Sequence, residues 1–253
     1  MGETTSITNY ILYTINNELA DSIKYLGRIH MRQPSIEQYL VANCLSIIDE
    51  FNILYKDCEN KELKKEADEK FNEMDLTVRV GYPFKQTVHY TAGEGGKARK
   101  ELKINHDLYV EQKDFKIEIK YLKNWKSSSD TWAASKKWSE FQQDFDWLMD
   151  EIDADNQGKV AFVIGWFNCV DSFSQLIQLG KGRGAHPIVN ESRRCYFPFL
   201  KREKEPTRTT DLKYNYPLAY KELDVIPISD RSKEYHCMFL GNEDDKFHFA
   251  IYY

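Results

Sequence analysis

The chain has 253 residues, of which 42% are hydrophobic and 30% are charged. With 16 Tyr, 14 Phe and 5 Trp, this composition predicts a globular protein with an aromatic core and excludes an intrinsically disordered chain. The net charge of −5 excludes a protein that coats nucleic acid through a globally basic surface, while a local basic groove stays compatible with it.

The chain shows no sign of a membrane or secretory destination. No stretch approaches the roughly 20 apolar residues that cross a bilayer. The start, MGETTSITNYILYT, lacks the basic region and the cleavage site of a signal peptide. We therefore expect a cytoplasmic protein without a membrane partner. The cysteines are widely spaced, form no C-x-x-C pair and are expected to be reduced structural thiols: Cys44, Cys58, Cys169, Cys195 and Cys237.

Three helices are predicted before the first strand. A leading helix over 7–30 follows from the three- and four-residue spacing of its Ile and Leu residues. Pro34 and Ser35 are well placed to open a second helix, whose apolar stripe runs to about residue 55. The run 58–73 is charged at nearly every position and predicts a solvent-exposed connecting helix.

Strand patterns dominate the rest of the chain. A long amphipathic helix is predicted over 131–152. We expect a mixed α/β protein of the α+β kind with a mixed sheet, divided into a leading segment 1–34, a core 35–167 and a β-rich C-terminal extension 168–253. Strands are predicted at 76–80, 87–90, 102–112, 115–122, 159–167, 223–228, 235–240 and 247–252.

The hairpin of strands 102–112 and 115–122 carries the candidate chemistry. A two-residue turn between them places Asp107 opposite Lys120 and makes Asp107 a diagonal neighbour of Glu118 on the same face. The β-carbons of the two acids are then within about 7–8 Å, over which two carboxylates can hold one divalent cation. Mg²⁺ held there would neutralise phosphate charge and lower the pKa of a bound water, and the lysine would orient that water. The pattern therefore predicts phosphodiester hydrolysis.

These residues resemble a known motif. Asp107, ten intervening residues and then Glu118-Ile119-Lys120 are similar to the motif of the PD-(D/E)xK nuclease superfamily. The predicted order of helix, three strands, helix and strand over 35–167 is also similar to the restriction endonuclease-like core. The resemblance implies that Asp107 and Glu118 bind Mg²⁺ and that Lys120 assists the attacking water. Asp107 follows His106, where the family motif has Pro.

The resemblance also implies an acidic residue from the first core helix. Glu37 fits this role because it falls on the inward stripe of that helix with Leu40, although an ordinary helix-surface residue is the alternative. Lys136, Lys137 and Gln142 on the following helix are candidates for supporting the site, and solvated side chains are the simpler interpretation.

Other interpretations of the hairpin stay open. An E-x-K triplet alone is weak evidence, because Glu111-Gln112-Lys113 also forms one. Asp107, Glu118 and Lys120 are also compatible with a solvated strand face that carries cross-strand salt bridges. Neighbouring side chains that we interpret as packed or surface residues rather than as bases or base-stacking rings are His89, His106, Trp125, Trp132 and Trp138.

We therefore predict a Mg²⁺-dependent endonuclease, with DNA as the expected substrate and restriction or defence as the setting that the resemblance implies. The region after residue 167 would serve target recognition or dimerisation, since cutting both strands of a duplex favours a homodimer. The alternative is a non-catalytic module for nucleic-acid binding or protein interaction that retains the same fold. The predicted nucleic-acid contacts are Lys123, Lys126, Arg183, Arg193 and Arg194.

Overall fold

The computed structural model divides the chain into two compact units, Met1–Pro34 and Ser35–Tyr253. It describes residues 34–85, 88–90, 106–122, 131–169, 180–181, 188–203, 212–226 and 235–253, so the fold below is that of the second unit. The leading helix expected over 7–30 lies outside the described residues. In the part of the chain that is described, no helix is both long enough and apolar enough to cross a bilayer.

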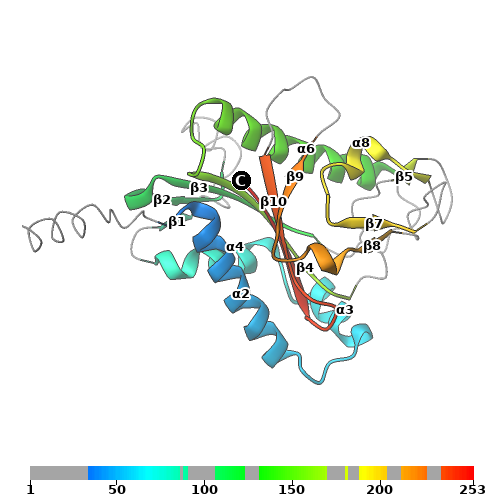
Figure 1. Ribbon diagram of the computed structural model, residues 1–253. Coiled ribbons are helices and arrows are strands. Elements are labelled where there is room, and N and C mark those ends of the chain that lie inside the picture. The colour runs from blue at the N-terminus through cyan, green and yellow to red at the C-terminus, as the bar shows by residue number, and fades with distance from the viewer. Residues whose placement is uncertain are drawn as a thin grey trace, which may run out of the picture. The chain divides into compact units, whose positions relative to one another are not determined.

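The second unit is built on one seven-stranded mixed sheet, which makes it an α+β structure (Figure 1). β3 and β4 pair in parallel, and the other neighbouring pairs of this sheet are antiparallel. A parallel pair needs a crossover connection, and helix α6 (Thr131–Asp153) supplies it between β3 and β4. The strand order is β1 (Val88–Tyr90), β2 (Leu108–Val110), β3 (Phe115–Tyr121), β4 (Val160–Phe167), β11 (Phe247–Tyr252), β10 (Tyr235–Leu240) and β9 (Glu222–Val225).

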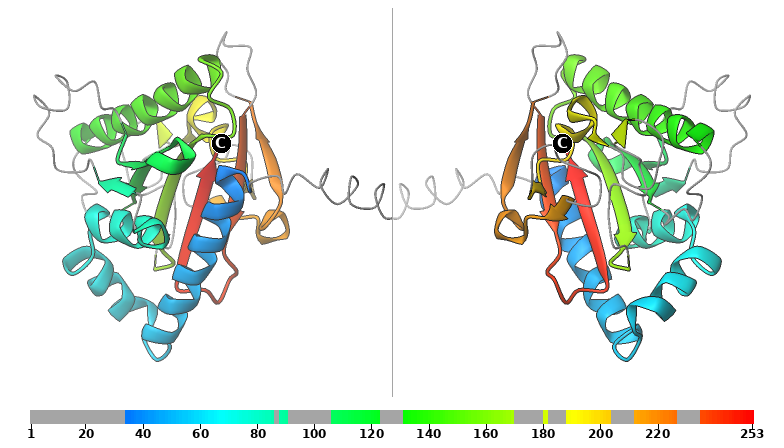
Figure 2. Two further views of the ribbon diagram at one scale, coloured as in Figure 1. Left: turned by 90° about the vertical axis from the view of Figure 1, so that its left-hand side faces the viewer. Right: turned by 90° about the vertical axis from the view of Figure 1, so that its right-hand side faces the viewer.

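Helices cover both faces of this sheet, with α6 on one face and α2 (Ile36–Leu54) on the other (Figure 2). The face of α2 is also covered by α3 (Asn60–Glu69), α4 (Glu73–Gly81) and the 3₁₀ turn η1 (Tyr82–Phe84). The remaining described elements are η2 (Glu111–Lys113), β5 (Gly180–Lys181), β6 (Ile188–Val189), α8 (Glu191–Arg194), β7 (Leu200–Arg202), β8 (Leu212–Tyr214) and η4 (Tyr216–Leu218).

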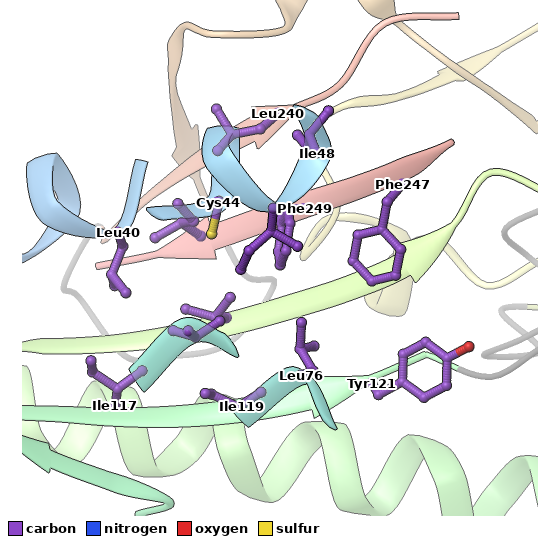
Figure 3. Close-up of a cluster of buried hydrophobic side chains, with 14 of the residues drawn as sticks. Leu40, Cys44, Ile48, Leu76, Ile117, Ile119, Tyr121, Leu240, Phe247 and Phe249 are labelled. Carbon is purple, nitrogen blue, oxygen red and sulfur yellow. The ribbon is translucent and has the colours of Figure 1, made fainter. Parts of the chain in front are cut away.

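A hydrophobic core lies between the sheet and α2 (Figure 3). Leu40, Cys44 and Ile48 repeat at four-residue intervals along α2 and are buried against the strands. Gly165 in β4 allows close packing there, because a β-carbon at this position would lie 2.8 Å from the side chains of Leu76 and Phe247. Strand β4 is buried along its whole length, as its continuous apolar run predicts for a strand covered on both faces.

A second core lies between the opposite face of the sheet and α6. Phe141, Phe145 and Leu148 of α6 have no exposed surface and pack toward β4 and the C-terminal strands. Strands β9, β10 and β11 continue the same sheet as β4, and their residues contribute to both cores. The C-terminal extension is therefore joined to the preceding region by backbone hydrogen bonds as well as by packing.

Residues 76–80 form a helix, so the predicted strand there is wrong. Asn72 caps helix α4 by accepting a hydrogen bond from the backbone of Asp75, whose carboxylate accepts one from the backbone of Asn72 in return. Leu76 and Val80 are both buried, and their spacing of four residues fits one face of a helix as well as alternate positions of a strand. The hydrogen bonds of the capping residues favour the helix over the strand.

The preceding charged run is helical, as predicted, but it is less exposed than predicted. Leu63 and Ala67 of α3 are buried, because these two apolar residues lie one helical turn apart on the side that faces the core. The high charge of the rest of α3 hid this narrow apolar face in the sequence.

Val78 gives a test of the helical assignment. Its side chain is 46% exposed on α4. We expect Val78→Ala to raise the free energy of unfolding by about 0.5 kcal/mol, because Ala is the better helix former at an exposed position. Val80→Ala is the control and should lower that energy by roughly 2 kcal/mol, because Val80 is fully buried. Urea unfolding measures both variants, and a clear loss at Val78 would favour a strand.

Candidate active site

The hairpin of β2 and β3 is shifted by two residues from the predicted register. Its pairs are Leu108 with Ile117, Tyr109 with Lys116 and Val110 with Phe115. The turn has four residues instead of two, because η2 is followed by Asp114 in a left-handed conformation with φ of 56°. A shift of two residues keeps every side chain on its predicted face. The prediction that Asp107 stands opposite Lys120 is therefore wrong, whereas their location on one polar side of the hairpin is retained.

Asp107 forms hydrogen bonds with the edge of β3 just beyond the residues that pair with β2. Its backbone N–H donates to the carbonyl of Ile117 at 3.1 Å, and its Oδ2 accepts from the N–H of Ile119 at 3.0 Å. The N–H groups of Lys116 and Leu122, at even positions, donate instead to the carbonyls of Lys159 and Gly165, on the side of β4. The N–H groups of the odd-numbered residues of β3 thus point toward the side of β2. Beyond the end of β2, the carboxylate of Asp107 accepts the hydrogen bond that a backbone carbonyl of a longer strand would accept.

Glu73 likewise accepts a hydrogen bond through its carboxylate, from a backbone N–H two residues further along β3. It is the first residue of α4, and its Oε2 accepts from the backbone N–H of Tyr121 at 3.0 Å. Because Ile119 and Tyr121 are two residues apart on one strand, the carboxylates of Asp107 and Glu73 lie at neighbouring positions of the same strand edge.

Lys120 and Asp144 form an ion pair between β3 and α6. Lys120 Nζ lies 3.1 Å from Asp144 Oδ2, and the two side chains are only 13% and 14% exposed. Burial lowers the pKa of Lys120, but the carboxylates of Asp144, Glu73 and Glu118 outweigh this effect and raise its pKa overall. Lys120 therefore carries its positive charge throughout the neutral range.

The pKa of Asp144 reflects its burial and the charges around it. Burial raises this pKa to about 6 against the opposing charge and hydrogen bond of Lys120, and the negative charges of Glu73 and Asp107 add smaller increases. Carboxylates from α4, β3 and α6 thus act on Lys120, and that of Asp107, just before β2, acts on Asp144. Asp107 and Glu118 are each only 6% exposed, so their carboxylates are held away from bulk water. Such a group of acids is costly to bury without a balancing cation.

Carboxylate oxygens are the ligands that hard divalent cations prefer. Within the ranges that the structure describes, no set of three His, Cys, Asp or Glu side chains is arranged to hold a metal ion. Mg²⁺ in proteins is usually held by one or two carboxylates, with water and substrate phosphate completing its shell. The donor set of Asp107 and Glu118 therefore fits Mg²⁺ in its chemistry.

The structure does not bring Glu37 to this site. Glu37 lies on α2, which packs on the face of the sheet that carries Ile117 and Ile119. Its carboxylate accepts a hydrogen bond from Ser35, and its charge acts on Tyr253 at the end of the chain. The helix preceding β1 is α4, so the acid that a preceding helix supplies is Glu73.

The predicted nucleic-acid contacts are placed only in part. Lys123, Lys126 and Arg183 lie outside the described residues. The guanidinium of Arg193 lies over the ring of Trp138 at 5.1 Å, and burial lowers the pKa of Arg193. Arg194 donates to Glu191 at 2.6 Å, so its charge is paired within α8.

The other candidates near the hairpin have structural surroundings. Trp138 is buried in the core on the α6 face, as we interpreted it, and Gln142 is exposed. The ring of His106 lies 6.4 Å from that of Trp147. All five cysteines are free thiols, and burial raises the pKa of Cys44 and Cys237. The side chains of His89, Trp125, Trp132, Lys136 and Lys137 are outside the described part of the structure.

Sequence reasoning missed Glu73 and Asp144. A signal for Asp144 was present, because it lies three residues after Phe141 and four before Leu148, on the apolar stripe of α6. A carboxylate on an apolar stripe needs a partner. Glu73 had no comparable signal, because the predicted strand over 76–80 concealed the helix that begins with it.

No protein-family model matches this sequence, and no match was found among curated proteins or among solved structures.

Proposed function

We propose that this protein is a Mg²⁺-dependent endonuclease that hydrolyses phosphodiester bonds of DNA. The observation that carries the proposal is the group of acids beside β3, in which Asp144 pairs with Lys120, Glu73 and Glu118 act on the same lysine, and Asp107 acts on Asp144. Several carboxylates gathered beside one strand supply the oxygen ligands that a site for a divalent cation would require.

The chain order supports the same proposal. Helix α4, strands β1, β2 and β3, helix α6 and strand β4 follow one another, with β3 and β4 parallel. This order is the one expected for a restriction endonuclease-like core. Asp107 directly precedes the second strand of this order, and Glu118 and Lys120 lie on the third, where the PD-(D/E)xK resemblance expects them. Glu73 comes from the helix before the strands.

In the proposed reaction Asp107 and Glu118 would hold the cation. Mg²⁺, when bound, would neutralise phosphate charge and acidify a bound water. The N–H of Ile119 donates to Oδ2 of Asp107 and so helps to fix the orientation of this carboxylate. Lys120 is held in its charged form by the surrounding acids. It therefore serves as a fixed positive charge that orients the nucleophile and stabilises the phosphate, rather than as a proton acceptor.

A cleavage assay tests the function directly. We expect purified protein to nick or cut plasmid DNA in Mg²⁺, and to lose this activity when EDTA is added. Single-stranded DNA and RNA in parallel reactions identify the substrate class. Binding should weaken steeply between 50 and about 200 mM salt, because phosphate contacts release counterions. Binding that persists in every divalent cation without cleavage would favour the non-catalytic module, and the absence of both would contradict the proposal.

A further inference from the structure

Two ion pairs join the same strand to the same helix, but they lie in different surroundings. Lys116 Nζ contacts Glu151 at 2.8 Å and Lys120 Nζ contacts Asp144 at 3.1 Å, each linking β3 to α6. Glu151 also accepts from the side chain of Asn156 at 2.7 Å, so that pair belongs to the end of the helix. The pair at Lys120 instead lies among the carboxylates of the candidate active site.

Stability alone does not account for Asp144. Its neighbours on the apolar stripe, Phe141, Phe145 and Leu148, are completely buried, and an apolar residue would continue the stripe. A buried ion pair is often no more stabilising than well-packed hydrophobic residues of similar volume. The rise in the pKa of Asp144, caused first by burial, shows that its charged form is held at a cost. The group that benefits is Lys120.

We infer that Asp144 is a positioning residue that acts through Lys120, holding its ammonium group from the side of α6 so that it points to one place beside Asp107 and Glu118. This inference rests on the proposed function. Lysine has four rotatable bonds and a compact charge, so an ammonium without a fixed partner would sample several positions along the acidic edge. Asp144 is anchored on a long helix packed against the sheet and limits the ammonium to one of them.

Asp144→Asn tests the inference, with Glu151→Gln as the matched control. Each variant neutralises one carboxylate of a β3 to α6 ion pair with little change of shape. We expect Asp144→Asn to lower kcat for Mg²⁺-dependent cleavage about 10- to 100-fold, the usual effect of removing a group that orients a ligand in a site. KM should stay within about twofold, because the same phosphate contacts remain. Glu151→Gln should leave kcat unchanged.

Two further variants separate positioning from folding. If Asp144 acts only through Lys120, adding Asp144→Asn to Lys120→Met should cause no further loss of kcat. Asp144→Glu keeps the charge and should retain more of kcat than Asp144→Asn does. Equal losses in Asp144→Asn and Glu151→Gln, or additive losses in the double variant, would overturn the inference.

A measurement without catalysis keeps this test independent of the proposed function. Nitrogen-detected NMR of lysine ammonium groups should show a slowly exchanging signal that Lys120→Met removes. That signal should disappear in Asp144→Asn and persist in Glu151→Gln. If the wild-type protein cleaves no nucleic acid, the endonuclease proposal fails while the NMR result still decides whether Asp144 holds Lys120. A Lys120 signal that survives in Asp144→Asn contradicts the positioning role whatever the activity.

Discussion

Asp107→Asn and Glu118→Gln are each expected to reduce Mg²⁺-dependent cleavage by about a thousandfold or more. Losing about 4 kcal/mol of transition-state stabilisation gives this factor, and a bound metal supplies several kcal/mol of that kind. The amides are chosen instead of alanine because both acids are 6% exposed. Alanine at Asp107 would also remove the acceptor for the N–H of Ile119, so a loss of activity would be mixed with a loss of structure.

Single-turnover cleavage of plasmid DNA measures these variants, with thermal unfolding to show that each is folded. Glu73→Gln and Glu37→Gln form the matched pair that identifies the accessory acid. Glu73 accepts a hydrogen bond from the edge of β3 next to Asp107, so Glu73→Gln should lose activity. Glu37 lies on the helix that covers the opposite face of the sheet, so Glu37→Gln should retain activity. Full activity in Asp107→Asn or Glu118→Gln would show that the substituted residue is not a metal ligand of the site.

Much of the framework could be predicted from local patterns, because periodicity and burial agree there. Helix α2, helix α6 and strands β4, β10 and β11 lie within about two residues of the predicted bounds. These elements have long apolar stripes or continuous apolar runs, which few alternative structures would bury. The same periodicity places the polar and apolar residues of β3 on their two faces, so the grouping of Glu118 with Lys120 followed from the sequence alone.

The parts that were missed depend on one local turn and on contacts between distant segments. The hairpin register was set by Asp114, whose left-handed conformation lengthens the turn, and Asp is only one of several residues that adopt it. The short strand β2 ends where Asp107 and Glu73 replace backbone partners, and no local period encodes such a replacement. Residues of this kind are found only when the helix start at Glu73 and the strand edge at Tyr121 are both known.

His248 is expected to make the protein sensitive to acid. The side chain is fully buried, and its ring lies 5.6 Å from that of Phe239 and 5.8 Å from that of Trp166. Its Nε2 is 3.0 Å from the carbonyl oxygen of Asn242. Gly241 makes room for the ring, because φ is 144° there and a β-carbon would collide with the imidazole. Burial lowers the pKa of His248 from 6.5 to about 4.

The sign of the effect follows from these two pKa values. Between about pH 6.5 and pH 4 the unfolded chain protonates this histidine and the folded protein does not, so the unfolded state gains stability as the pH falls. The contribution of His248 to the free energy of unfolding is complete above pH 6.5 and declines by about 3 kcal/mol on acidification to pH 4. Asp144 acts in the opposite direction, because its raised pKa of about 6 lets the folded state keep a proton that the unfolded state releases.

Comparing the wild type with a His248 variant separates the effect of His248 on stability from the effects of Asp144 and the other carboxylates. His248→Gln retains a donor for the carbonyl of Asn242 and does not titrate, so we expect it to be less stable than the wild type at pH 7. The gap between the two proteins in the free energy of unfolding should narrow by about 3 kcal/mol between pH 7 and pH 4. His236→Gln is the control, because that side chain is 32% exposed and pairs with Asp224 at the surface. Urea titrations at five pH values measure the gap, and a constant gap would show that His248 does not stay neutral in the folded protein.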